Sequence, residues 1–133
     1  MNRKNIVIGL ITMCLPTWAM AETVALRCMY MQTTYDAPFM SQPEKRDCPE
    51  SLCYYDVTFD SAGGTASVNG VAGHQLEITA DDYVLTRSVS NRIVEGMDTA
   101  FFTINRQSLK FKSKKTTPPS VSVSAAGSCV AAQ

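Results

Sequence analysis

The sequence predicts an all-β domain: a small antiparallel barrel or sandwich of seven to eight short strands, stapled by two disulfides. Three observations predict it. Apolar and polar residues alternate with a period of two over most of the chain after residue 21. Turn-forming glycine, asparagine, aspartate and proline interrupt this alternation at short intervals, and four of the five cysteines lie in the same part of the chain. No stretch after residue 21 has the 3.6-residue apolar period of an amphipathic helix.

Residues 1–21 have the three parts of a secretory signal peptide. Two basic residues precede an apolar run over 6–15, and the segment ends in an A-x-A pattern formed by Ala19 and Ala21. The apolar run is shorter than the roughly 20 residues that span a bilayer. We therefore expect cleavage after Ala21, a single mature β-domain over 22–133, no membrane span, and a periplasmic or secreted protein.

The first strands follow directly, and each has a clear apolar face. In the segment TVALRCMYMQ, Leu26 and Cys28 share one face, and in CYYDVTFD the inward face carries Val57 and Phe59. These residues are the expected core. The predicted strands occupy residues 23–32, 53–60, 65–68, 74–80, 83–89, 99–106, 108–114 and 120–130.

Short turns separate most of these strands, because glycine, asparagine and aspartate adopt the backbone angles that tight turns require. One connection is longer: the segment 33–50, rich in proline and charge, is expected to be one long loop. The short turns are predicted at Gly63-Gly64, Asn69-Gly70, Asp81-Asp82, a tight hairpin near 106–108, and a break at Pro118-Pro119.

Four cysteines follow the predicted signal peptide, and an even number in a short exported chain predicts disulfides. The C-x4-C spacing of Cys48 and Cys53 matches neither a redox C-x-x-C pair nor a usual zinc clip. We prefer the pairs Cys48–Cys53, around Pro49, and Cys28–Cys129, which would join the first strand to the last. A Cys28–Cys53 bridge stays open, because sequence alone does not fix connectivity. We expect no metal and no cofactor.

The cysteine in the first strand, the TINRQS hairpin and the closing GSC resemble features of small exported bacterial β-domains of uncharacterised function, with an Ile-x-Arg turn and a terminal Gly-x-Cys. The resemblance covers Leu26–Cys28 and Thr103–Cys129. It implies an all-β fold and a terminal disulfide, with no activity attached. Leu109 stands where a turn glycine would be expected, and the Cys48–Cys53 pair is an addition to the pattern.

The residues that could support catalysis do not form a recognisable set. His74 is the single histidine, lies just after a turn and is expected at the surface. Asp56 and Asp60 share a strand face but would be about 13 Å apart, beyond the roughly 5–9.5 Å between glycosidase carboxylates. A G-x-S-x-G nucleophile motif is absent. We therefore expect no enzymatic activity, and a hydrolase with dispersed residues is the weakest alternative.

Charge is distributed unevenly. Residues 22–98 hold five basic and twelve acidic residues, whereas 99–133 hold five basic residues and no acidic one. Four basic residues of equal parity would line one face of a continuous strand, while Phe111 points the other way. Such a face fits an acidic partner or an edge strand guarded by lysines; without interleaved aromatics, nucleic acid is not expected. The predicted basic binding face consists of Arg106, Lys110, Lys112 and Lys114.

These observations favour an exported module that acts by binding. We expect the partner to be another exported protein, with this chain acting as an inhibitor or immunity-type partner, or an acidic component of the cell envelope. The alternative is a carrier that encloses a small apolar ligand in a barrel. The cavity of such a carrier would be lined by Tyr55, Phe59, Leu76 and Phe102.

Overall fold

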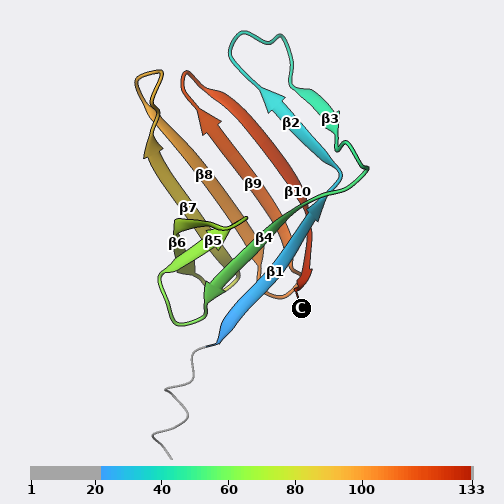
Figure 1. Ribbon diagram of the computed structural model, residues 1–133. Helices are drawn as coiled ribbons and strands as arrows, with labels where there is room; N and C mark the ends of the chain where they lie inside the picture. The colour runs from blue at the N-terminus through green and yellow to red at the C-terminus, as the bar shows by residue number, and fades with distance from the viewer. Residues whose placement is uncertain (1–21, 133) are drawn as a thin grey trace, which may run out of the picture.

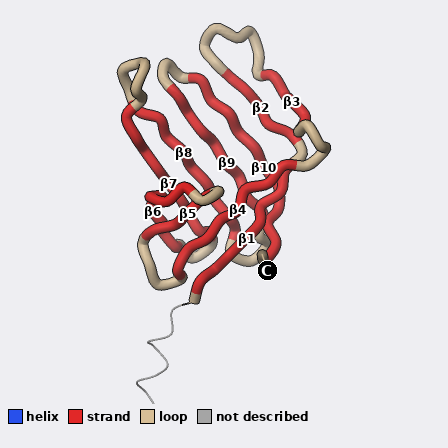
Figure 2. Tube along the Cα trace, viewed as in Figure 1, coloured by secondary structure: helices blue, strands red, loops and turns tan. Residues whose placement is uncertain are grey.

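The computed structural model describes residues 22–132, and these residues form ten strands and no helix (Figure 1, Figure 2). Hence no helix in this range could cross a membrane. The predicted signal peptide lies outside the described residues. The strands are β1 (Thr23–Tyr30), β2 (Gln32–Asp36), β3 (Glu44–Asp47), β4 (Cys53–Asp60), β5 (Thr65–Val68), β6 (Val71–Ile78), β7 (Asp82–Ser90), β8 (Met97–Asn105), β9 (Lys110–Thr117) and β10 (Val121–Ala131).

Eight of the ten described strands form a closed antiparallel barrel. Their order is β1-β4-β5-β6-β7-β8-β9-β10, and β10 pairs back with β1 to close the ring. The other two, β2 and β3, continue the sheet beyond β10. The predicted all-β antiparallel fold with two disulfides is therefore confirmed, and of the two expected architectures the protein adopts the barrel.

The N-terminal strand is divided in two by a bend at Met31. Its first half, β1, pairs with β10 through Cys28 and Cys129, and its second half, β2, pairs with the same strand through Thr33 and Ala125. The two registers differ by one residue, as expected for a β-bulge at the bend. In Figure 1, β2 lies beside the upper part of β10 and β3 lies beyond β2, as an open extension of the barrel wall.

The prediction of one long loop over 33–50 is wrong. This segment contains most of β2 and all of β3, which pair with each other as a hairpin. No residue of β3 is buried, and β2 is at most partly buried. Because the hairpin projects beyond the barrel, neither of its faces needs an apolar row, so the sequence lacks the alternation that reveals the other strands.

The barrel interior is filled by apolar and aromatic side chains. Leu26, Cys28, Val57 and Phe59 are buried, as the alternation predicts. Tyr55 packs edge-on against Phe102, with ring centroids 4.9 Å apart. The buried core cluster consists of Leu26, Cys28, Val57, Phe59, Ala66, Val68, Leu85, Phe102, Ile104, Phe111 and Cys129.

Turn chemistry agrees with the predicted hairpins. Asn69 and Gly70 both have positive φ, 51° and 80°, as a two-residue type I′ turn requires. In the hairpin between β8 and β9, the Asn105 side-chain oxygen accepts hydrogen bonds from the backbone N–H groups of Gln107 and Ser108. Leu109 then has φ +60°, which explains why a glycine is expected there, and its side chain packs against the core.

Both preferred disulfides are present. Cys28–Cys129 joins β1 to β10 between residues that are direct cross-strand partners, and Cys48–Cys53 joins the end of β3 to the start of β4. Two disulfides in a small domain indicate an oxidising compartment outside the cytoplasm.

Candidate functional site

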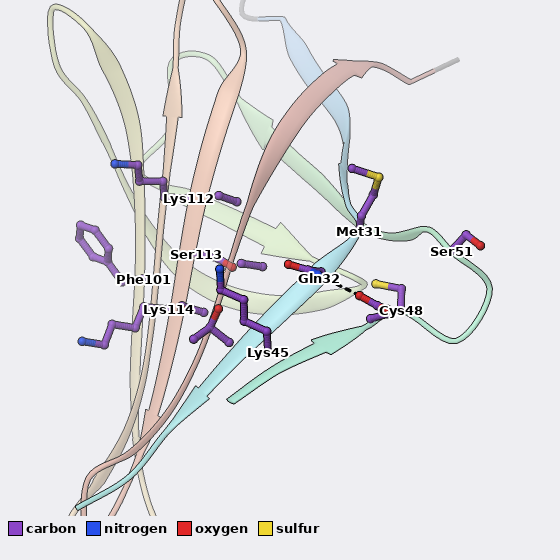
Figure 3. A pocket seen from close by; sticks show the side chains of 14 residues that line it. Met31, Gln32, Lys45, Cys48, Ser51, Phe101, Lys112, Ser113 and Lys114 are labelled. Carbon is purple, nitrogen blue, oxygen red and sulfur yellow. Dashed lines mark hydrogen bonds between the residues drawn. The ribbon is translucent and has the colours of Figure 1, made fainter. Parts of the chain in front are cut away.

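A groove of about 1060 Å³ opens on the outer face of the sheet, where the β2–β3 extension meets the barrel wall. Its side chains come from β2, β3, β8, β9 and β10, from the bend at Met31 and from the loop after β3 (Figure 3). The lining residues are Met31, Gln32, Thr34, Lys45, Asp47, Cys48, Ser51, Phe101, Lys112, Ser113, Lys114, Ser124, Ala125 and Ala126.

Strand register explains why the sheet is hollow here. One continuous row of cross-strand neighbours runs Phe101–Lys114–Ser124–Thr34–Lys45, through β8, β9, β10, β2 and β3. The middle of the row has short side chains, and both ends have long ones. Neighbouring strands are about 4.8 Å apart, so the walls on β9 and β3 are roughly 14 Å apart along the sheet. β10 and β2 therefore form a floor between two walls.

A second row, two residues along each strand, repeats this arrangement. Lys112 on the β9 wall faces the short Ala126 of β10, and on the other side Gln32 of β2 faces Asp47 of β3. The Gln32 side-chain amide donates a hydrogen bond to the Asp47 carboxylate at 2.9 Å. The two rows make the groove continuous along the strand direction.

The groove carries more positive than negative charge. Three lysines line it: Lys45, Lys112 and Lys114. The groove has one carboxylate, that of Asp47, which accepts the hydrogen bond from Gln32. Within residues 22–132 the ion pairs are Arg27–Asp56 and Arg46–Glu44, so the three groove lysines have no carboxylate partner there. Lysine side chains that have no carboxylate partner attract acidic ligands.

Apolar side chains are exposed beside these lysines. Phe101 lies on the β8 side and is 46% exposed, while Met31, at the bend between β1 and β2, is 68% exposed. Figure 3 shows Phe101 beside Lys112 and Lys114, with Met31 across the groove. A ligand that lies between them can therefore bury apolar surface as well as meet the lysines.

The structure brings together only part of the predicted basic face. Lys110, Lys112 and Lys114 alternate with inward-facing residues and are exposed on the outer face of β9, but Lys110 does not line the groove. Arg106 belongs to the β8–β9 turn, not to the strand. Its guanidinium donates a hydrogen bond to the Thr79 carbonyl at 2.7 Å and so supports the neighbouring turn.

Sequence reasoning missed Lys45. This lysine lies in β3, within the segment expected to be a loop, so no register placed it opposite β9. The local pattern EKRD contains no apolar residue that would indicate which way its side chains point. Only the pairing of β3 with β2 places Lys45 in the groove.

The prediction of a surface His74 is wrong. The side chain lies in β6 and is only 4% exposed, and its buried Nδ1 finds no hydrogen-bond partner in the described part of the chain. Burial lowers the pKa of His74, and the positive charges of Arg87 and Lys115 lower it further, against a hydrogen bond to the Val71 backbone that raises it. The common parity of His74 and Leu76 was the signal that could have placed the ring inside.

The other candidate residues have structural partners. Asp56 pairs with Arg27, and the Asp60 carboxylate accepts the backbone N–H of Ala62 in the following turn. Across residues 22–132, no three histidine, cysteine, aspartate or glutamate side chains are grouped as metal ligands.

The residues expected to line an apolar cavity belong to the packed core or contact it. Phe59 and Phe102 are 3% and 4% exposed, and Phe59 contacts Tyr83 with ring centroids 4.8 Å apart. This packing lends no support to an enclosed ligand between them.

Comparison with protein-family models, with curated proteins and with solved structures found no match for this chain. Function is therefore inferred from the groove and from the chemistry of its residues.

Proposed function

We propose that this chain is an exported, non-enzymatic binding module whose outer groove holds an extended acidic segment of another exported protein. One observation carries the proposal: three lysines that have no carboxylate partner among residues 22–132 surround a floor of short side chains, beside exposed Phe101 and Met31.

The shape of the groove favours an extended polypeptide. Its floor follows two strands, and its walls are separated by roughly three strand spacings, about 14 Å, which leaves room for one chain between the lysines. Acidic residues of the partner would meet Lys45, Lys112 and Lys114, and its apolar residues would contact Phe101 and Met31. Charge complementarity of this kind accelerates association and selects among partners.

The compartment fits such a role. Two disulfides support a location outside the cytoplasm, and the predicted signal peptide favours the periplasm or secretion. A small stapled domain that binds another exported protein would act as an inhibitor or an immunity-type partner. The apolar carrier is the weaker alternative, because the aromatic side chains that would line its cavity fill the barrel instead.

The test compares charge reversals inside and outside the groove. A partner is captured from the exported fraction with the mature protein and purified, and its affinity is measured for the wild type, for Lys112→Glu with Lys114→Glu, and for Lys110→Glu. The double reversal is expected to weaken binding on the order of a hundredfold, with an association rate that falls as salt rises. Lys110→Glu is the matched control, since Lys110 lies on the same face of β9 beyond the groove.

Two results would overturn the proposal. One is a loss of binding free energy in Lys110→Glu of half or more of that in the double variant, which would indicate a general charge effect because the control reverses half as many charges. The other is groove-dependent binding to lipopolysaccharide vesicles with none to a protein, which would assign the groove to an envelope component.

A further inference from the structure

A second group of basic side chains lies on the inner face of the sheet, opposite to the groove. Arg87, Ala100 and Lys115 are direct cross-strand neighbours on β7, β8 and β9. Leu85, Phe102 and Ser113 form a neighbouring row on the same three strands, and all three are buried. Arg87, Ala100 and Lys115 are each two residues from a member of this row, so they point to the same side as the core.

The short side chain of Ala100 leaves space between the two cations. The Cα atoms of Arg87 and Lys115 are two strand spacings apart, about 10 Å, and both side chains are long enough to converge on a small group above Ala100. Arg87 is partly buried and Lys115 is exposed, so an anion can approach both from solvent.

His74 completes the group from the next strand. β6 and β7 pair through Gln75 and Thr86, and one residue further this register sets His74 opposite Arg87. The Arg87 side chain lies over the neighbouring Gly73, where a Cβ atom would be 3.9 Å from Nε. His74 is 4% exposed, and its Nδ1 lacks a partner.

The described residues supply no acidic partner for this cluster. The inward-facing acid of β8 is Asp98, and its carboxylate accepts a hydrogen bond from the Asn91 side chain at 2.8 Å. On β3, Glu44 and Arg46 pair with each other. The inward residues beside His74 on β5 and β4, Ala66 and Phe59, are apolar. Within residues 22–132, neither Arg87 nor Lys115 makes an ion pair, so two unpaired cations lie beside the histidine.

We propose that His74, Arg87 and Lys115 form a binding site for a small oxyanion such as sulfate or phosphate. The guanidinium and the ammonium donate charge-assisted hydrogen bonds to its oxygens. His74 donates to the Val71 backbone through one ring nitrogen, so Nδ1 has a free lone pair when the ring is neutral and an N–H when it is protonated.

Anion binding and protonation of His74 are therefore linked. A bound oxyanion places negative charge close to the His74 ring, which favours the protonated form. By reciprocity, protonation of His74 strengthens anion binding by the same factor by which the anion favours protonation. This site is separate from the groove, and its failure would leave the proposed function untouched.

Sulfate is the probe of choice, because its charge is constant across the pH range in which histidine titrates. Backbone amide spectra are recorded during sulfate titrations near pH 5.5 and near pH 7.5, on either side of the ordinary histidine pKa of about 6.5, with chloride holding the ionic strength constant. Shifts are expected at His74, Arg87, Ala100 and Lys115, with affinity on the order of tenfold tighter at the lower pH.

Variants assign these effects to the three residues. Arg87→Gln and Lys115→Gln should each weaken sulfate binding at both pH values, and His74→Gln should leave binding near pH 7.5 but remove its pH dependence. Lys114→Gln is the matched control, since Lys114 adjoins Lys115 but faces the groove. Sulfate shifts that match those of chloride, or equal losses in Lys114→Gln and Lys115→Gln, would overturn the site. Arg87→Gln keeps the test decisive if His74→Gln does not fold.

Discussion

Gly127 of β10 lies directly against the backbone of Met29 in β1: a Cβ atom at Gly127 would be 1.9 Å from the Met29 carbonyl oxygen. No side chain fits at that distance, and the obstacle is backbone that cannot rotate away. Gly127 is the glycine of the closing Gly-x-Cys pattern, two residues before Cys129. The pattern therefore has a steric cause, since only glycine lets the last strand approach the first closely enough to close the barrel.

Replacement of Gly127 by alanine should destabilise the barrel, because the two strands must separate to admit a methyl group. Overpacking of this kind costs about 1–3 kcal/mol. Urea unfolding of Gly127→Ala measures the loss. Gly64→Ala is the control: no atom lies within 4 Å of the added Cβ, so its stability should stay within about 0.5 kcal/mol of the wild type. Equal stability of the two variants would contradict the steric explanation.

The two disulfides should differ in their contribution to stability. Cys28–Cys129 closes a loop with a sequence separation of 101, and Cys48–Cys53 one of 5. In the chain-entropy model the long loop stabilises by about 4–5 kcal/mol and the short loop by about 2 kcal/mol. Paired cysteine-to-alanine variants, unfolded in urea, compare the two bridges. A larger loss for the Cys48–Cys53 variant would show that this bridge acts mainly through the folded state.

Stability should decrease in mild acid because of His74. Burial lowers the pKa of this histidine. Below the ordinary value of 6.5, the unfolded chain therefore binds a proton that the folded protein does not, and the free energy of unfolding falls with decreasing pH until the folded pKa is reached. Above pH 6.5 the group contributes no slope. Urea unfolding in chloride buffers measures this dependence, and His74→Gln should flatten it. An unchanged slope in the variant would assign the effect to other groups.

Filling the groove should block binding without any change of charge. Ala126 is exposed on the groove floor, so the large side chain of Ala126→Tyr would occupy the space between the walls. Affinity for the captured partner should fall at least about tenfold, which corresponds to about 1.4 kcal/mol. Ser128→Tyr provides the comparison, because Ser128 is exposed on the same face of β10 beyond the groove. An equal loss of affinity in Ala126→Tyr and Ser128→Tyr would argue against the groove as the binding surface.

The sequence predicts those strands whose inward face must be apolar. β4 is an example: Val57 and Phe59 are buried, whereas Thr58 and Asp60 are exposed, so a period of two is visible. β3 is the opposite case, because all four residues are exposed and no alternation remains to be read. The missing hairpin was therefore a consequence of its position beyond the barrel, where burial no longer constrains residue type.

For the same reason, only part of the candidate site could be predicted from the sequence. Parity along β9 correctly set Lys112 and Lys114 on one face, since that is a local property of a strand. The placement of Lys45 in the groove depends on which strands pair and in what register, and the sequence does not reveal either. His74 was misplaced because the preceding glycine suggested a turn, although β6 continues through Gly73 with a φ of +93°.

The seam between β1 and β10 has a consequence for how the chain acquires its shape. One of the two neighbours of β1 is β10, which lies near the opposite end of the sequence. The two strands pair from Met29–Ser128 to Leu26–Ala131. A chain made from its N-terminus cannot close the barrel before Ser128–Ala131 exist. Until then β1 keeps an unpaired edge, and contacts of such long sequence separation form slowly. Closure of the barrel is therefore a late event in folding, after Val121–Ala131 has been made.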